Sequence, residues 1–284
     1  MQNALTFDVE EYFQVEAFSS VVRMEQWDSY PSRVVDSTRR LLDLLARRTV
    51  RATFFVLGWV AARHASLVRD IRAGGHELAC HGYAHRPIYT LTPDAFRDDV
   101  RRGKQAVEDA GGVRVLGYRA PTFSVVKNSL WALEILAEEG FVYDSSIFPI
   151  VHDRYGIPDA PRFPYRVALP HGGDLVEFPI TTLQIAGQRL PFCGGGYFRL
   201  APYRLVRAGL RHVNRHDGKP AIVYLHPWEM DPDQPRAPVG YLRRLRHSVN
   251  IHRTATKLDW LLAEFPFAPV DEVLCEQHLL ENAQ

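Results

Sequence analysis

The amino-acid sequence predicts an α/β protein in which strands and helices alternate around a parallel sheet or barrel. The chain of 284 residues is 46% hydrophobic, which is enough to bury one large core. Apolar runs of strand length alternate with amphipathic stretches of helix length along most of the chain. The segment 148–170 is rich in proline and aromatic residues and is typical of an ordered excursion, not of a flexible linker. We therefore expect a single domain over residues 1–284.

Local patterns place each element of this alternation. The run 4–9 is a strand, and 32–48 is a helix because Leu41, Leu42 and Leu45 share one face. Glycines mark several helix ends, and Thr92 followed by Pro93 is typical of a helix start. By the same criteria we expect strands at 52–57, 76–79, 175–178 and 221–225, and helices at 61–73, 92–110, 130–139, 202–215 and, for most of its length, 241–265.

Charge and cysteine content argue against several classes of protein. Lysine and arginine total 34 against 33 aspartate and glutamate residues, so the formal net charge of +1 gives no field that would attract nucleic acid or an anionic membrane. The cysteines Cys80, Cys193 and Cys275 are widely spaced and form no CxxC pair. Neither a disulfide framework nor a cysteine zinc knot is expected.

No targeting segment is evident in the sequence. The stretch 1–13 lacks the basic, apolar and small-residue regions of a secretory signal. No window reaches the roughly 18 consecutive apolar residues of a membrane span. We expect a soluble cytoplasmic protein without a transmembrane segment, at most peripheral to the inner membrane.

Two carboxylates, Asp8 and Glu10, stand at the end of the first predicted strand. The period of two places both on one face of the strand, while Val9 points the other way. Like charges this close raise the pKa of one carboxyl unless a cation shares the site. The pair is therefore a proton-sharing dyad, a base beside a metal ligand, or, together with Glu11, the solvated start of a loop.

Two histidines, His81 and His85, follow the strand predicted at 76–79. Two imidazoles four positions apart can converge on one ion from a helical turn or a tight loop, although among twelve histidines this spacing also arises by chance. In a barrel this segment opens onto the same face as Asp8 and Glu10. A His, His, carboxylate set favours zinc or a similar ion and leaves room for a water, whose pKa the metal lowers to about 7. Asp8 would then be the base.

Five ordered motifs resemble those of the polysaccharide deacetylase family, the NodB-like carbohydrate esterases. They are TFDVE (6–10), ATFFV (52–56), GHELACHGYAH (75–85), YRAPTF (118–123) and YLH (224–226). The segment GGGYFRL (194–200) resembles the subgroup associated with exopolysaccharide and exosortase systems. The resemblance implies a distorted (β/α) barrel with a deacetylase core over about 4–228, followed by a C-terminal helical extension over about 240–284.

The resemblance also implies a role for each motif residue. Asp8 would be the general base and His226 the general acid, with Arg119 paired to Asp8 and Asp144 paired to His226. The implied metal ligands are Glu10, His81 and His85, holding a divalent ion, Zn²⁺ in the first place and Co²⁺ or Ni²⁺ as substitutes. The substrate contacts implied are the backbone N–H of Thr122 as oxyanion donor, Leu225 against the acetyl methyl, and Trp228 in the pocket.

Two departures from the family pattern bear on these roles. Many relatives carry adjacent aspartates where this chain reads Asp8-Val9-Glu10, which makes Glu11 a rival ligand, although strand geometry aims it away from Asp8. Asp144 is followed by two serines where relatives carry a tryptophan motif, so the partner of His226 is open.

Several of these candidate residues also have a purely structural interpretation. His226 at the end of an apolar run could be a hydrogen-bonded structural histidine, and Arg119 a surface arginine. The glycines 194–196 lack the setting of a phosphate loop and predict a close approach of backbones near the site. Some aromatic residues could stack on sugars or simply fill the core: Trp228, Phe123, Tyr197 and Phe198.

The hypothesis that follows is a metal-dependent hydrolase that removes N-acetyl groups from amino sugars of a bacterial exopolysaccharide or its precursor. Its partners would be an N-acetylated glycan and the polysaccharide assembly machinery; no oligomeric state is predicted. The alternatives are a hydrolase of another C–N bond, such as a cyclic amide or formamide, and a non-catalytic carbohydrate-binding protein.

Overall fold

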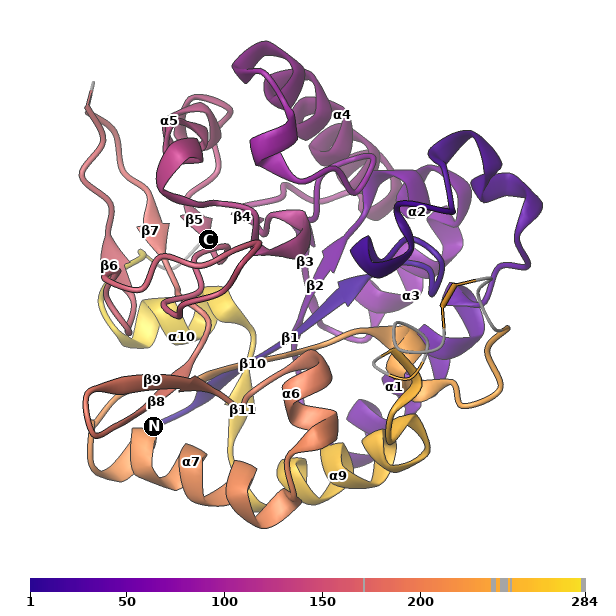
Figure 1. Ribbon diagram of the computed structural model, residues 1–284. Helices are drawn as coiled ribbons and strands as arrows, with labels where there is room; N and C mark the ends of the chain where they lie inside the picture. The colour runs from indigo at the N-terminus through magenta and orange to yellow at the C-terminus, as the bar shows by residue number, and fades with distance from the viewer. Residues whose placement is uncertain (171, 236–238, 241–244, 246, 282–284) are drawn as a thin grey trace.

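The computed structural model describes residues 1–170, 172–235, 239–240, 245 and 247–281. Strands and helices alternate along the chain, as an α/β protein requires (Figure 1). The strands are β1 (Asn3–Val9), β2 (Thr53–Val56), β3 (Glu77–Cys80), β4 (Gly117–Tyr118), β5 (Tyr143–Asp144), β6 (Tyr165–Arg166), β7 (Val176–Glu177), β8 (Thr182–Ile185), β9 (Gln188–Pro191), β10 (Ile222–Leu225) and β11 (Phe267–Ala268). The α-helices are α1 (Val34–Arg48), α2 (Gly58–Arg63), α3 (Ala65–Ala73), α4 (Pro93–Gly111), α5 (Trp131–Glu138), α6 (Gly195–Leu200), α7 (Tyr203–Arg215), α9 (Ile251–Glu264) and α10 (Val270–Glu276).

The main sheet is largely parallel and curls into a distorted barrel. Its strands lie in the order β10-β1-β2-β3-β4-β5-β7-β6, with β11 also paired to β1 and β6 antiparallel to β7. Beyond β10, the Tyr224 N–H donates to the Cys193 carbonyl at 3.2 Å, and the Ile222 N–H donates to Thr181 Oγ1 at 2.7 Å. These contacts join β10 to the chain that follows β7. The sheet thereby closes most of the way round, which confirms the predicted distorted (β/α) barrel.

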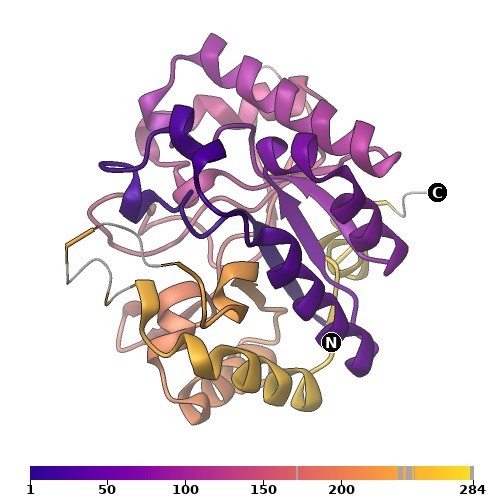
Figure 2. The ribbon, with the colours of Figure 1, turned by 90° about the vertical axis from the view of Figure 1, so that its right-hand side faces the viewer.

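Helices surround this sheet on its outer side. Figure 1 shows α1 to α4 along one flank of the central strands and α7 and α9 along another, and Figure 2 shows the orange helices and α9 grouped below the indigo and purple ones. Contacts between α1 and α9 join the two groups. None of the helices in the described part of the chain is long and apolar enough to cross a membrane.

Strand β1 separates the outer core from the barrel interior. Leu5, Phe7 and Val9 are fully buried in the hydrophobic core that includes the helices, whereas Thr6 and Asp8 alternate with them and face the interior. This is the period of two that the sequence shows. A strand that is apolar on its outer face can therefore carry polar chemistry on its inner face.

Helix α10 covers the end of the barrel at which the strands begin. The Val270 N–H donates to Thr53 Oγ1 at 2.7 Å, and the Asp271 N–H donates to Glu77 Oε2 at 3.3 Å. Thr53 and Glu77 are the first residues of β2 and β3. The opposite end, where β1 and β3 deliver Asp8 and His81, is the one available for a site.

The long elements were predicted within a few residues, and so were the short strands β2, β3, β7 and β10, whereas the remaining short elements were missed. The helix expected at 61–73 is two helices, because the chain breaks at His64 between α2 and α3. Of the helix expected at 241–265, α9 occupies 251–264, while 241–244 and 246 lie outside the described residues. The strands β4 and β5 are two residues long and show no periodicity that a sequence could reveal.

Candidate active site

Asp8 sits inside the barrel with a buried arginine as its counter-ion. Arg119 Nη1 lies 2.8 Å from Asp8 Oδ1 and 2.7 Å from Thr6 Oγ1. The rest of the guanidinium donates to the carbonyl and the hydroxyl of Ser145, both at 3.0 Å. Arg119 is fully buried, so the surface-arginine reading is wrong and the pairing with Asp8 that the family resemblance implies is present. An ion pair of this kind keeps a carboxylate charged out of water.

His81 and His85 converge on Glu10. Glu10 Oε2 lies 2.6 Å from His85 Nε2 and 4.0 Å from His81 Nε2, and one ligand atom of each residue lies within 4.8 Å of the others. His81 Nδ1 contacts the Arg119 carbonyl at 2.8 Å, which turns Nε2 toward Glu10. The loop between the histidines is held by Asp99, whose carboxylate accepts the backbone N–H groups of residues 83 and 84.

The chemistry of this cluster fits a divalent cation. Burial raises the pKa of Glu10, but His85 and the other histidines outweigh it and lower that pKa to about 2, so the carboxylate is ionised. Burial lowers the pKa of His81 to about 4, against the opposing effect of Asp8, which leaves this imidazole neutral as a ligand must be. Burial also lowers the pKa of His85, yet Glu10 raises it above its usual value. The ionised Glu10 carboxylate therefore favours a positive charge at the point on which both imidazoles converge.

Glu10, and not its neighbour Glu11, faces the histidines. The carboxylate of Glu11 accepts the N–H groups of Arg33 at 2.9 Å and Val34 at 3.2 Å, at the start of α1. Its Oε1 also accepts the hydroxyl of Ser32 at 2.5 Å. Glu11 thus stabilises the first turn of a helix, a position where anionic groups are favourable.

His226 lies on the other side of Asp8 and Glu10. Its Nε2 is 3.9 Å from Asp8 Oδ2 and 3.7 Å from Glu10 Oε1, and its side chain is 18% exposed, more than any other group of the cluster. Its Nδ1 contacts Glu229 Oε1 at 2.7 Å. Burial lowers the pKa of His226, but Glu229, Glu10 and Asp8 together raise it to about 9. Among the side chains of the cluster that can carry a proton, the His226 imidazole lies closest to solvent.

The partner of His226 is Glu229, which corrects the expectation that Asp144 would hold this place. Glu229 belongs to the short helix η6 (Pro227–Met230), and its second carboxylate oxygen lies 2.8 Å from Arg199 Nε of α6. Asp144 is fully buried elsewhere: its Oδ1 accepts the Ser146 hydroxyl at 2.5 Å, and it neighbours Glu177. Asp144 is therefore hydrogen-bonded to Ser145, Ser146 and Glu177. It has no contact with His226.

The expected substrate-contacting residues surround this cluster. Thr122 adopts a left-handed conformation with φ of 59°, and no described residue accepts its N–H. Leu225 ends β10 directly before His226 and is fully buried. Trp228 donates from Nε1 to Glu10 Oε1 at 3.2 Å and stacks against His226. Strain at a loop residue such as Thr122 is typical of functional sites.

Most of the aromatic residues considered for sugar stacking are packed inside the protein. Phe198 is fully buried, and Phe123 and Trp228 are 7% and 5% exposed. Tyr197 is half-buried. The core reading is therefore correct for Phe198 and Phe123.

Sequence reasoning missed Glu229 and Arg199, although both lie in segments that it singled out. Glu229 comes three residues after His226, which is one helical turn, and Arg199 lies within the glycine-rich segment 194–200. A carboxylate one turn after a candidate acid histidine was the available signal.

Comparisons with known proteins agree with this fold. Residues 19–140 match the sequence model of the polysaccharide deacetylases, and residues 145–275 match that of a domain of unknown function, DUF3473. The fold defines the class as a distorted (β/α) barrel of the kind found in polysaccharide deacetylases. The N-terminal part of the chain, residues 19–140, belongs to the polysaccharide deacetylase family.

Individual relatives match part of the chain. It is 29% identical over 101 residues to the peptidoglycan-N-acetylglucosamine deacetylase of Bacillus cereus, covering 35% of this chain and 37% of that protein. It is 36% identical over 73 residues to the chitooligosaccharide deacetylase of Rhizobium leguminosarum bv. trifolii, covering 26% and 34%. The match to the bifunctional xylanase/deacetylase of Pseudobutyrivibrio xylanivorans is 34% over 100 residues, covering 35% and 16%. The chain thus spans well under half the length of these relatives.

Solved structures share the fold over nearly the whole chain. A Mycobacterium smegmatis protein described as a polysaccharide deacetylase superposes with a TM-score of 0.63 at 22% identity, covering 99% of this chain and 92% of that one. The Puue allantoinase superposes with a TM-score of 0.64 at 16% identity, covering 99% and 91%. At these sequence identities the structural similarity establishes the barrel fold alone.

Replacing each of the adjacent glutamates separates their two roles. We expect Glu10→Gln to weaken Zn²⁺ binding at least about tenfold, because a charged ligand is lost, without lowering the unfolding temperature of the metal-free protein. We expect Glu11→Gln to retain Zn²⁺ affinity and to lose about 1 kcal/mol of stability, because the first turn of α1 loses its anionic acceptor. Calorimetric titration with Zn²⁺ and thermal unfolding in EDTA measure the two effects. Equal loss of Zn²⁺ affinity in both variants would contradict the assignment.

The buried Asp144 and Glu177 pair predicts a dependence of stability on pH. Burial raises the pKa of both carboxyls, and the neighbouring Asp144 raises that of Glu177 further. The folded protein therefore binds these protons more tightly than the unfolded chain, and the stability they contribute, complete below about pH 4, is lost as the pH rises through the folded pKa values.

We expect Glu177→Gln to gain in unfolding temperature relative to the wild type as the pH is raised from about 5 to about 9, because a neutral amide oxygen still accepts the Ile147 N–H without carrying charge. Thermal unfolding across that range measures the gain. The exposed Glu25→Gln variant is the control. Parallel curves for Glu177→Gln and the wild type would show that the pair does not release a proton in this range.

Proposed function

We propose that this protein is a divalent-metal-dependent deacetylase that removes N-acetyl groups from the amino sugars of a bacterial exopolysaccharide or its precursor. The observation that carries the proposal is the meeting of three groups inside one end of the barrel. These are Asp8 paired with Arg119, the cluster of Glu10, His81 and His85, and His226, whose pKa is raised to about 9. A base, a cation site and an acid within a few ångströms of one another are the components of amide hydrolysis.

Glu10, His81 and His85 would hold the ion, which supplies the Lewis acidity that activates water at neutral pH. Asp8 accepts a proton from the attacking water, and Arg119 keeps its carboxylate charged and oriented. The Thr122 N–H donates to the oxygen that becomes negative when the acetyl carbon turns tetrahedral. His226 donates its proton to the leaving nitrogen, so that acetate and a free amine are released.

Glu229 and Arg199 act on this reaction through His226. The 2.7 Å contact to Nδ1 fixes the imidazole so that Nε2 points at Asp8 and Glu10. Arg199 in turn holds the Glu229 carboxylate at 2.8 Å. Both charges are buried, so Glu229 and Arg199 together limit the orientations open to the imidazole.

A hydrolase of another C–N bond is the second candidate, because the barrel is also similar to the Puue allantoinase. The family match over residues 19–140 and the deacetylase relatives favour the first candidate. Full activity after complete chelation, in protein shown to contain no metal, would favour the second, since Glu10 would then have no ion to hold.

Release of acetate tests the proposed reaction. We expect purified protein with Zn²⁺ or Co²⁺ to release acetate from N-acetylated chito-oligosaccharides or from an acetylated exopolysaccharide. We expect Asp8→Asn to lower the rate about 100-fold or more while retaining Zn²⁺, because only the base is removed. No acetate from any of these substrates, with Asp8→Asn indistinguishable from wild type, would refute the proposal.

Glu229 predicts a selective loss of kcat. We expect Glu229→Gln to lower kcat about tenfold or more with KM and Zn²⁺ affinity nearly unchanged, because the charge that supports the protonated imidazole is removed while the shape is kept. Asp144→Asn is the matched control, since Asp144 is an equally buried acid without contact to His226. A larger loss of kcat in Asp144→Asn than in Glu229→Gln would restore the original pairing.

A further inference from the structure

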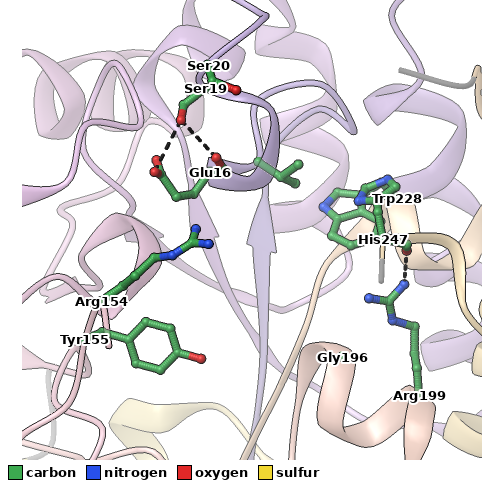
Figure 3. A pocket seen from close by; sticks show the side chains of 10 residues that line it. Glu16, Ser19, Ser20, Arg154, Tyr155, Gly196, Arg199, Trp228 and His247 are labelled. Atoms are coloured by element: carbon green, nitrogen blue, oxygen red, sulfur yellow. Dashed lines mark hydrogen bonds between the residues drawn. The ribbon is translucent and has the colours of Figure 1, made fainter. Parts of the chain in front are cut away.

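A cavity of about 550 Å³ opens beside the candidate active site (Figure 3). Its walls come from five parts of the chain: the segment around the short helix η1 (Glu16–Phe18), the loop that contains Arg154 and Tyr155, helix α6, Trp228 and His247. Trp228 donates to Glu10, so the cavity begins one side chain away from the cluster. Its size is within the usual range for pockets that bind small molecules.

The aromatic rings of this cavity are already packed against other rings. Trp228 stacks on His226 and His247, with ring centroids 5.0 and 4.3 Å apart, and is only 5% exposed. Tyr155 stacks on Phe148 and His152 at 5.9 and 3.8 Å. A sugar ring therefore finds little free aromatic face here, and the edges and polar atoms of the walls are what it can reach.

Two opposite charges face each other across the cavity. Figure 3 shows the guanidinium of Arg154 directed toward the carboxylate of Glu16. The two form no ion pair with each other, and neither forms an ion pair with another described residue. The remaining cation of the wall, Arg199, is 2.8 Å from Glu229 and is buried. Glu16 is also close to Ser19, whose hydroxyl donates to its carboxylate at 3.2 Å.

A ligand between these groups must offer both a donor and an acceptor, because a carboxylate only accepts hydrogen bonds and a guanidinium only donates them. Neighbouring hydroxyl groups of a sugar do both. We propose that the cavity is a subsite for the sugar unit next to the N-acetylated one, held by its hydroxyl groups between Glu16 and Arg154. The identity of the ligand as a glycan rests on the proposed function.

Binding to a catalytically impaired protein tests the subsite apart from the reaction. In full-length Asp8→Asn protein loaded with Zn²⁺, we expect tri-N-acetylchitotriose to bind about tenfold or more tightly than N-acetylglucosamine. Adding Arg154→Ala or Glu16→Gln removes most of this gain and leaves binding of the monosaccharide unchanged, and Arg154→Lys restores part of it. Arg69→Ala, on the outer surface of α3, is the matched control and keeps the full gain.

Each outcome separates the subsite from the proposed reaction. No gain from monosaccharide to trisaccharide, or a gain that persists in both Arg154→Ala and Glu16→Gln, overturns the subsite. Loss of binding in Arg154→Ala only for oligosaccharides that contain a uronic acid overturns the assignment to hydroxyl groups and indicates an anionic ligand. If the chain-length preference is lost in both variants but wild-type protein releases no acetate, the subsite stands and the proposed reaction fails.

Discussion

The buried ion pair between Arg119 and Asp8 is the interaction on which the rest of the site depends. A fully buried guanidinium is costly unless every part of it is satisfied. Here it donates to Asp8, to Thr6 and twice to Ser145, and its carbon lies 4.1 Å above the ring of Phe55. Removal of either charge would leave the other unpaired inside the barrel. The same contacts therefore keep the proposed base ionised and tie three strands of the sheet together at the end where they carry chemistry.

Arg119 also links the base to the cation site through its backbone. Its carbonyl contacts His81 Nδ1 at 2.8 Å, which leaves Nε2 directed at Glu10. Directly after it, Pro121 and the left-handed Thr122 turn the chain sharply. One short segment thus positions a counter-ion, orients a ligand and presents a free backbone N–H. A hydrogen-bond partner that orients a metal-ligating histidine commonly affects the metal affinity about as strongly as the ligand itself.

The parts of the site that the sequence predicts are those that follow strands with a recognisable apolar pattern. Asp8, Glu10 and His81 belong to this class, because β1 and β3 have an apolar outer face that reveals where each strand ends. Arg119 follows a strand of two residues, so its place came from the family resemblance and not from periodicity. Asp144 was misplaced because its role came from the resemblance alone: the serines beside it left its partner open, and its contact with the distant Glu177 has no local signal. The partnership of Glu229 with Arg199 joins segments thirty positions apart, which no local pattern can show.

The glycine run 194–196 explains how that partnership is reached. A side chain at Gly194 would place its Cβ 2.1 Å from a ring carbon of Tyr224, so only glycine lets this segment lie directly against β10. Its close approach brings α6 beside the end of β10, where Arg199 meets Glu229 and Glu229 meets His226. Gly196 and Arg199 also line the cavity next to Trp228. The close backbone contact predicted from the glycines therefore has two results. It positions Arg199 and Glu229 behind the candidate acid His226, and it forms one wall of the proposed sugar subsite. A change in the path of α6 must alter both.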